Sequence, residues 1–94
     1  MKVLITGATG LVGSHLARQL AREHEVLALT HRDLDITDRA AVQRCVLQAK
    51  PGLIFNCAVL QVDESEQQRA KAHAVNVDGP RFLAEVASDI GAEM

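Results

Sequence analysis

The chain has 94 residues, with ten lysines and arginines against twelve aspartates and glutamates, and it contains no tyrosine or tryptophan. This length allows one small domain, and a hydrophobic content of 48% with 23% charged residues excludes an intrinsically disordered chain. The net charge of −2 gives no reason to expect nucleic acid or an anionic membrane as a partner.

The first third of the chain alternates between strand-like and helix-like patterns. The short apolar run Val3–Ile5 is typical of a strand that is buried on both faces of a sheet. Apolar residues between Leu11 and Leu20 then recur at helical spacing, which predicts a helix that reaches about Glu23. A second buried strand is predicted at 26–29.

The same alternation continues to the end of the chain. Asp38 has the position of an N-cap for a helix that Pro51-Gly52 terminates. A third buried strand follows at 53–55, and the remainder predicts two helical pieces, at about 64–77 and 80–90. A kink or a restart is expected between these pieces because proline cannot continue a helix without disturbing it.

Strands that alternate with helices indicate an α/β fold, in which crossover helices connect the strands of a parallel sheet. We predict a Rossmann-type sheet with strand order 3-2-1-4 that is incomplete on its C-terminal side. In this order the short β-rich run Leu34–Ile36 forms an additional edge strand.

Three glycines, Gly7, Gly10 and Gly13, lie between the first strand and the first helix. The first suits a tight turn, the second lets a pyrophosphate approach the backbone, and the third lets the helix pack closely on the sheet. The free N–H groups of a helix that begins near Leu11 would face the same anion. The strand–turn–helix context therefore favours a phosphate site over a glycine-rich turn without a ligand.

These residues resemble a known family. The pattern TGxxGxxG, from Thr6 to Gly13, is similar to that of the extended short-chain dehydrogenase/reductases. Within this superfamily the segments 34–38 and 62–66 most resemble the dTDP-4-dehydrorhamnose reductases, which reduce the 4-keto group of a nucleotide sugar with a nicotinamide cofactor. A nucleotide-sugar epimerase or dehydratase is the alternative among enzymes, since it shares the same N-terminal elements.

The resemblance also implies a set of cofactor-binding residues. Asp35 and Ile36 match the acidic-apolar pair that contacts adenine, and the run Asn56–Ala58 matches an element that lines the cofactor. The Asn76–Pro80 segment matches the family's long helix, where Asn76 either bonds the local backbone or supports the active site. Together with the residues that follow the first and second strands, the expected cofactor site comprises Gly7, Thr9, Gly10, Leu11, Val12, Gly13, His31, Arg32, Asp35, Ile36, Asn56, Cys57 and Ala58.

The residues after the second strand indicate which dinucleotide is preferred. In this fold an acid at that position accepts a hydrogen bond from the ribose 2′-hydroxyl of NAD(H). Here Thr30 is followed by His31 and Arg32, and the first carboxylate is Asp33. Because a guanidinium pairs well with a phosphate, we predict that NADP(H) is preferred and NAD(H) is the alternative.

The catalytic residues of the family are not found. Its members pair a tyrosine general acid with a lysine, downstream of the segment that resembles Asn76–Gly79, and this chain contains no tyrosine. We therefore expect residues 1–94 to be the N-terminal part of one NAD(P)-binding Rossmann domain from a longer reductase, inactive alone. The alternatives are a non-catalytic nucleotide-binding regulatory subunit and a subunit that uses the fold for protein contacts.

Composition and flanking patterns predict where such a chain resides. Cys45 and Cys57 are too few for a disulfide framework and lie in apolar runs, which predicts reduced thiols and no metal site. No apolar run reaches the ~18 residues that cross a membrane, and the N-terminus shows no signal-peptide pattern. We expect a cytoplasmic protein whose strand 53–55 has an unpaired edge that promotes self-association.

Overall fold

A computed structural model describes residues 1–59 and 66–94 of the chain. The elements, in chain order, are β1 (Lys2–Thr6), α1 (Leu11–Leu20), β2 (Glu25–Leu29), α2 (Arg39–Ala49), β3 (Leu53–Asn56), α3 (Glu66–His73), the π-helical segment η1 (Ala74–Asp78) and α4 (Gly79–Ile90). The predicted strand–helix alternation is therefore confirmed. The beginning of the predicted 64–77 helix and most of the 62–66 segment lie outside the described residues.

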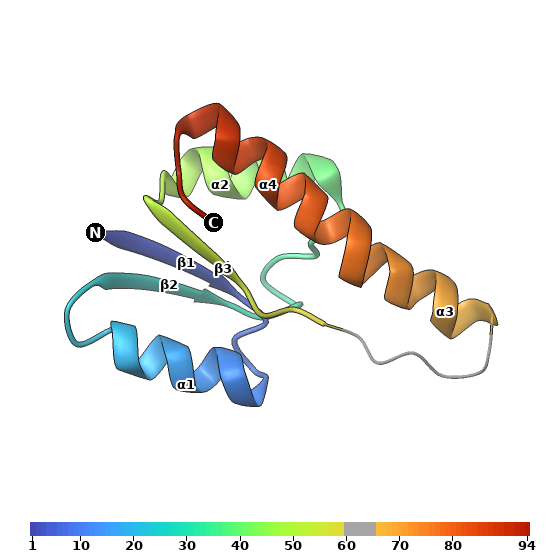
Figure 1. The fold of residues 1–94 in the computed structure, drawn as a ribbon, viewed down its shortest axis with the longest axis horizontal. Coiled ribbons are helices and arrows are strands. Elements are labelled where there is room, and N and C mark those ends of the chain that lie inside the picture. Colours follow the sequence, from blue (N-terminus) through green and yellow to red (C-terminus); the bar gives the residue numbers. More distant parts are fainter. Residues whose placement is uncertain (60–65) are drawn as a thin grey trace.

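The sheet consists of parallel strands in the order β2-β1-β3, with β1 in the centre (Figure 1). Leu4 lies opposite Leu27 on one side and Ile54 on the other. This arrangement confirms the predicted parallel α/β fold and the predicted order of these strands. It places the carboxyl ends of β1, β2 and β3 at one edge of the sheet, where open α/β sheets bind their ligands.

The additional edge strand predicted at Leu34–Ile36 is not formed, and this part of the prediction is wrong. Asp35 instead accepts hydrogen bonds from the Thr37 backbone N–H (3.0 Å) and hydroxyl (2.6 Å), which bends the chain locally. Leu34 and Ile36 are still buried, because both side chains belong to the hydrophobic core. The apolar residues that predicted a strand are thus buried by a loop instead.

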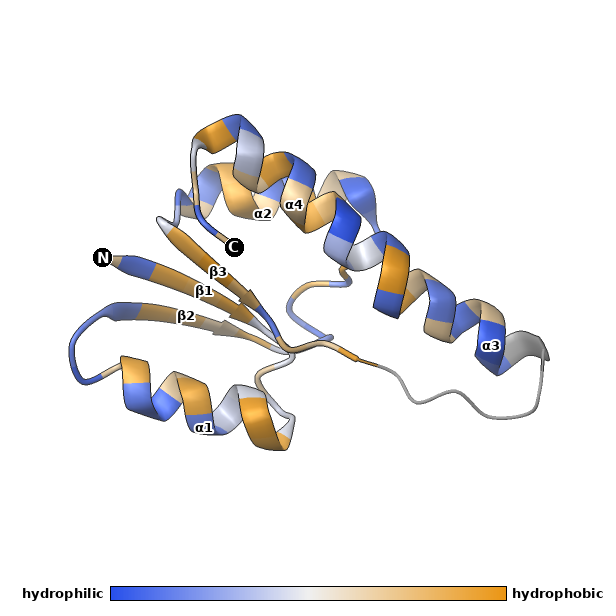
Figure 2. Cartoon of the chain, in the orientation of Figure 1, coloured by the Kyte–Doolittle hydropathy of each residue, from blue (hydrophilic) through white to orange (hydrophobic). Residues whose placement is uncertain are grey.

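Helix α1 covers one face of the sheet, and α2 and α4 cover the other (Figure 1). The core on the α2–α4 side joins Leu4 and Ile54 of the sheet to residues of the two helices: Val42, Val46, Leu83, Val86 and Ala87. Hydropathy mapped on the cartoon shows apolar residues along the strands and along the helices that pack on them (Figure 2). Helices α2 and α4 therefore bury apolar stripes, as periodicity predicts for crossover helices.

Local signals fix the helix ends. The Asp38 carboxylate accepts a hydrogen bond from the Ala41 backbone N–H at 3.1 Å, which confirms the predicted N-cap of α2. The expected disturbance before Pro80 takes the form of η1, an insertion of π-helical geometry that joins α3 to α4 in one continuous rod. Gly91 ends α4 with φ of 74°, a left-handed conformation that glycine adopts without strain.

The outer edge of β3 is not fully bare. The Ile54 N–H donates to the Glu93 carbonyl at 2.9 Å, and the Glu93 N–H donates to the Gly52 carbonyl at 3.0 Å. Glu93 thereby forms an isolated parallel bridge with Leu53. The prediction that this edge is bare is therefore wrong for its amino-terminal half, because Glu93 covers the backbone there.

None of the helices within residues 1–59 and 66–94 combines the length and the apolar character that a membrane span needs.

Candidate functional site

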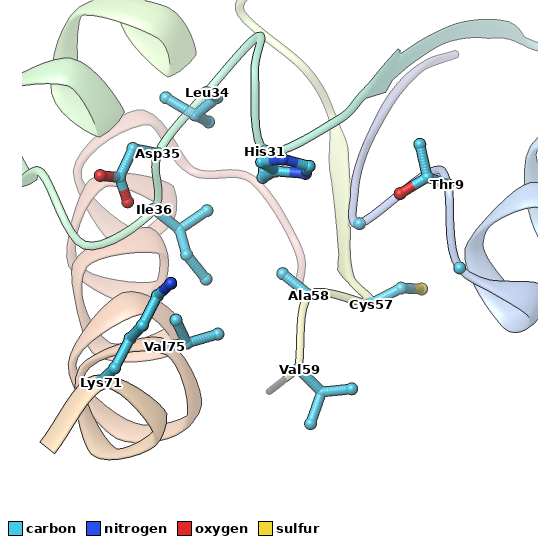
Figure 3. A pocket seen from close by; sticks show the side chains of 12 residues that line it. Thr9, His31, Leu34, Asp35, Ile36, Cys57, Ala58, Val59, Lys71 and Val75 are labelled. Carbon is cyan, nitrogen blue, oxygen red and sulfur yellow. The ribbon is translucent and has the colours of Figure 1, made fainter. Parts of the chain in front are cut away.

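A pocket of about 560 Å³ opens at the carboxyl ends of β1 and β3, within the size range of small-molecule sites. It lies between the glycine-rich β1–α1 turn, the loops that follow β2 and β3, and the face of the α3–η1 rod (Figure 3). The lining residues are Gly7, Thr9, Gly10, His31, Leu34, Asp35, Ile36, Cys57, Ala58, Val59, Lys71 and Val75.

The glycine-rich turn is fixed by contacts that exclude side chains. Gly7 has φ of 68°, and a Cβ there would lie 2.5 Å from the Ala58 backbone nitrogen. A Cβ on Gly13 would overlap the Gly7 carbonyl oxygen, so the helix can approach the turn only because this residue is glycine. Gly10 differs, since its Cβ would make only one ordinary contact, with the Gly7 carbonyl oxygen at 3.4 Å. The first and third glycines therefore serve the fold, and the second leaves the pocket open.

Helix α1 begins at this turn. Its N-cap, Gly10, provides no side-chain acceptor, so the first backbone N–H groups of the helix remain available to an anion. The Leu11 and Val12 side chains are 88% and 70% exposed and do not line the pocket. Both residues, like Gly13, contribute backbone N–H groups to the N-terminus of α1 and no lining side chain.

Asn56 occupies the carboxyl end of β3 without lining the pocket. Its Oδ1 accepts hydrogen bonds from the buried Thr6 hydroxyl at 2.5 Å and from the Ala58 backbone N–H at 3.2 Å. These bonds connect the ends of the two neighbouring strands and shape the turn that brings Cys57 and Ala58 to the pocket. The contribution of Asn56 is therefore to position its neighbours.

In the loop after β2, only His31 of the three consecutive residues 31–33 lines the pocket. His31 lines the pocket, whereas Arg32 is exposed and does not line it. The Asp33 carboxylate accepts hydrogen bonds from the Thr30 backbone N–H (2.9 Å) and hydroxyl (3.1 Å), which hold the pKa of Asp33 below its usual range. Asp33, the first acid after β2, lines a second depression along the β2 edge and does not line this pocket.

Asp35 and Ile36 line the side of the pocket that is opposite the glycine turn (Figure 3). The hydrogen bonds from the Thr37 hydroxyl and backbone N–H lower the pKa of Asp35, with a smaller contribution from the positive charge of Lys71. Ile36 is 5% exposed and provides an apolar wall. An ionised acceptor therefore stands beside an apolar surface at this end.

Sequence reasoning missed the wall that the α3–η1 rod provides. Lys71 and Val75 line the pocket although neither belongs to a recognised motif. Their i, i+4 spacing places them on one face of a helix, which was a usable signal, but only the tertiary structure shows which face meets the pocket. Leu34 and Val59 are further lining residues that were not predicted.

Neither metal chemistry nor disulfide chemistry is indicated at this pocket. Over residues 1–59 and 66–94, no group of three or more histidine, cysteine or acidic side chains is arranged to hold a metal ion. Cys45 and Cys57 are both free thiols. Cys57 lines the pocket, whereas Cys45 lies at the β2-edge depression, where burial raises the pKa of its thiol.

Comparison with known proteins gives a consistent family. The model of the RmlD substrate binding domain matches residues 1–94. The dTDP-4-dehydrorhamnose reductase of Mycobacterium tuberculosis strain H37Rv is 43% identical over 95 aligned residues, which cover 99% of this chain and 31% of that protein.

Solved structures agree with this match. The chain is similar to a dTDP-4-dehydrorhamnose reductase from Clostridium acetobutylicum, with a TM-score of 0.91, 41% identity and coverage of 99% of this chain and 34% of that one. It is also similar to the dTDP-4-dehydrorhamnose reductase of Bacillus anthracis in complex with NADP, with a TM-score of 0.88, 34% identity and coverage of 97% and 33%. The chain thus spans about a third of the length of the relatives that it matches.

Proposed function

The chain belongs to the RmlD substrate-binding domain family, and from this premise we propose that residues 1–94 bind the ADP half of a nicotinamide dinucleotide. We assign them to the N-terminal part of a single Rossmann domain. The observation that carries the proposal is the pocket at the carboxyl ends of β1 and β3, where glycine backbone and the N-terminus of α1 meet.

The residues present fit such a ligand. The side-chain-free backbone of Gly10 and the uncapped start of α1 suit the approach of a pyrophosphate, and the apolar surfaces of Ile36, Ala58 and Val75 suit an adenine ring. The 560 Å³ volume is large enough for an adenosine with its phosphates. When bound, the nicotinamide half would supply the hydride for carbonyl reduction.

We propose NADP(H) as the preferred dinucleotide and NAD(H) as the weaker one. The first carboxylate after β2, Asp33, bonds Thr30 and does not line the pocket, which leaves the ribose 2′ position without an acidic acceptor from this residue. His31 lines the pocket and Arg32 is exposed beside it, where both suit a 2′-phosphate. A similar reductase, that of Bacillus anthracis, was solved in complex with NADP, which supports this preference.

The complete protein would reduce the 4-keto group of a nucleotide sugar. The support is the identity of 34–43% with dTDP-4-dehydrorhamnose reductases across nearly the whole chain. The 94 residues contain no tyrosine and therefore supply no phenol for general acid catalysis. We propose that this chain binds the dinucleotide without turnover in the cytoplasm, and that it self-associates through the part of the β3 edge that Glu93 leaves unpaired.

Protection of a cysteine tests the proposed site directly. Cys57 lines the pocket and Cys45 does not, so one chain carries both the probe and its control. With NADPH at about ten times its Kd, alkylation of Cys57 by N-ethylmaleimide should slow about tenfold, because only the free chain reacts. The Cys45 rate should stay the same. Peptide mass spectrometry at several times of reaction measures both rates in the same sample.

Each result of the alkylation experiment has a clear meaning. Unchanged Cys57 reactivity at saturating NADPH would contradict binding at this pocket. Equal slowing of both thiols would indicate general stabilisation of the chain instead of local contact. Substituting NADH at the same concentration should give weaker protection of Cys57, and equal or stronger protection would contradict the NADP(H) preference.

A further inference from the structure

Lys71 occupies a position in the pocket that no recognised motif explains. It lies on α3, one helical turn before Val75, and both side chains line the pocket next to Asp35 and Ile36. Figure 3 shows the Lys71 side chain extending along the rod toward the loop that carries Asp35 and Ile36. Its aliphatic stem therefore adds to the apolar wall, and its ammonium group stands at the end of the pocket farthest from the glycine turn.

A close contact between the rod and this loop fixes the position of Lys71. Gly79, the first residue of α4, is buried, and a Cβ there would lie 2.5 Å from Ile36 Cδ1. Ala72, next to Lys71, is only 1% exposed. Because α3, η1 and α4 form one continuous helix, the Gly79–Ile36 contact also sets the distance between α3 and the loop. Lys71 therefore faces Asp35 as a consequence of packing, although its own side chain is exposed.

Asp35 and Lys71 offer opposite hydrogen-bonding groups. The Asp35 Oδ1 already accepts two hydrogen bonds from Thr37, and neither of these bonds uses Oδ2. Lys71 is close enough to Asp35 for its charge to affect the carboxylate, yet it forms no ion pair within 4.0 Å with any of the acids that the structure describes. An acceptor and a cationic donor thus both line this end of the pocket.

We propose that Lys71 reads the base of the bound dinucleotide, as a specificity-determining partner of Asp35. This inference rests on the proposed dinucleotide site. Adenine presents a donor, the N6 amino group, beside an acceptor, ring N1, and the carboxylate and the ammonium group match this pair. Hypoxanthine presents the reverse order, with an oxygen at position 6 and a hydrogen on N1. Lys71 therefore favours adenine over hypoxanthine, and its stem covers the face of the base.

Titration with ADP and IDP tests this proposal, because the two nucleotides carry the same phosphates and differ only in the base. We expect the chain to bind ADP more tightly than IDP. Lys71→Met keeps the aliphatic stem and removes the donor, so its Kd for ADP should rise about fivefold. Its Kd for IDP should change less than about twofold. Isothermal titration calorimetry on the intact chain measures all four constants, and circular dichroism verifies that the variant is folded.

Arg69→Met is the matched control, since Arg69 is exposed on the same helix, two residues earlier, and does not line the pocket. It removes the same charge and should leave the ADP-to-IDP ratio unchanged. Equal weakening of ADP and IDP by Lys71→Met, or the same ratio change with Arg69→Met, would overturn base reading by Lys71. If the unmodified chain binds neither ADP nor NADPH, the proposed dinucleotide site itself is wrong and this inference falls with it.

Discussion

The two ends of the pocket are built in different ways. The glycine end, residues 7–13, is one contiguous stretch that presents backbone and almost no side chains. The side-chain end brings together residues from two separate segments, the loop after β2 and the α3–η1 helix: His31, Asp35, Ile36, Lys71 and Val75. The first end is determined by steric exclusion, because Gly7 and Gly13 contact backbone that cannot move away. The second end is determined by the packing of the α3–α4 rod on the loop after β2.

This difference indicates how each end of the pocket should respond to amino-acid substitutions. Backbone N–H groups at a helix start bind any phosphate and do not distinguish one dinucleotide from another. Charged side chains on a loop and a helix can be exchanged singly without disturbing the sheet. We therefore expect substitutions at the glycine end to affect folding, and substitutions at the side-chain end to affect the choice of ligand.

The largest effect should come from Gly13→Ala. The new Cβ would overlap the Gly7 carbonyl oxygen, so α1 must shift away from the turn. We expect the free energy of unfolding to fall by about 2–3 kcal/mol, the range of severe overpacking. Urea denaturation followed by circular dichroism measures this loss.

Gly10→Ala is the matched variant at the same end. Its Cβ has its nearest neighbour at 3.4 Å, so stability should change by less than about 1 kcal/mol. Dinucleotide binding should still weaken, because the new methyl group occupies the open side of the turn. An equal loss of stability in both variants would contradict the separate roles of these glycines.

The glycine end and the sheet could be predicted from the sequence because their signals are local. The spacing of Gly7, Gly10 and Gly13, and the buried runs at the strands, depend on residues close together in the chain. The loop at Leu34–Ile36 shows where a local pattern predicts the wrong element. Its alternating apolar residues are buried in the core although the segment pairs with no strand.

The side-chain end could be predicted only in part. His31 was predicted because it follows a strand, and Asp35 because the family resemblance implies it; both line the pocket in the structure. Lys71 and Val75 were missed because their place depends on a tertiary contact, that of Gly79 with Ile36, which no local pattern encodes. The family resemblance assigned Asn56 to the cofactor lining, whereas in the structure its Oδ1 accepts hydrogen bonds from Thr6 and Ala58 and the residue does not line the pocket.

An intermediate effect is expected from His31→Ala combined with Arg32→Ala. Removing both groups should raise the Kd for NADPH about tenfold, since a charge-assisted contact with the 2′-phosphate is lost, and change the Kd for NADH less than about twofold. Tryptophan is absent from the chain, so the fluorescence of the reduced nicotinamide itself reports binding.

Arg22→Ala is the control for this double variant, because Arg22 is an exposed cation in the α1–β2 turn and does not line the pocket. It should leave the ratio of the NADPH and NADH constants unchanged. Equal weakening of NADPH and NADH in the double variant would show that these residues do not recognise the 2′-phosphate.

The smallest effect concerns Thr37→Val at the side-chain end. The Thr37 hydroxyl donates to Asp35 Oδ1 at 2.6 Å and is the main cause of the lowered pKa of Asp35. A lowered folded-state pKa means that Asp35 stabilises the fold above the unfolded value of about 3.9, and that this contribution is lost as the pH falls through the folded-state pKa. Thr37→Val retains the backbone N–H donor, so the pKa should rise part of the way toward its usual value. Because the carboxylate is exposed, the accompanying loss of stability at neutral pH should stay below about 0.5 kcal/mol.

Titration of the Asp35 carboxyl carbon by NMR measures the shift of its pKa in Thr37→Val. An unchanged titration curve would show that the Thr37 hydroxyl does not control the ionisation of Asp35 at this end of the pocket.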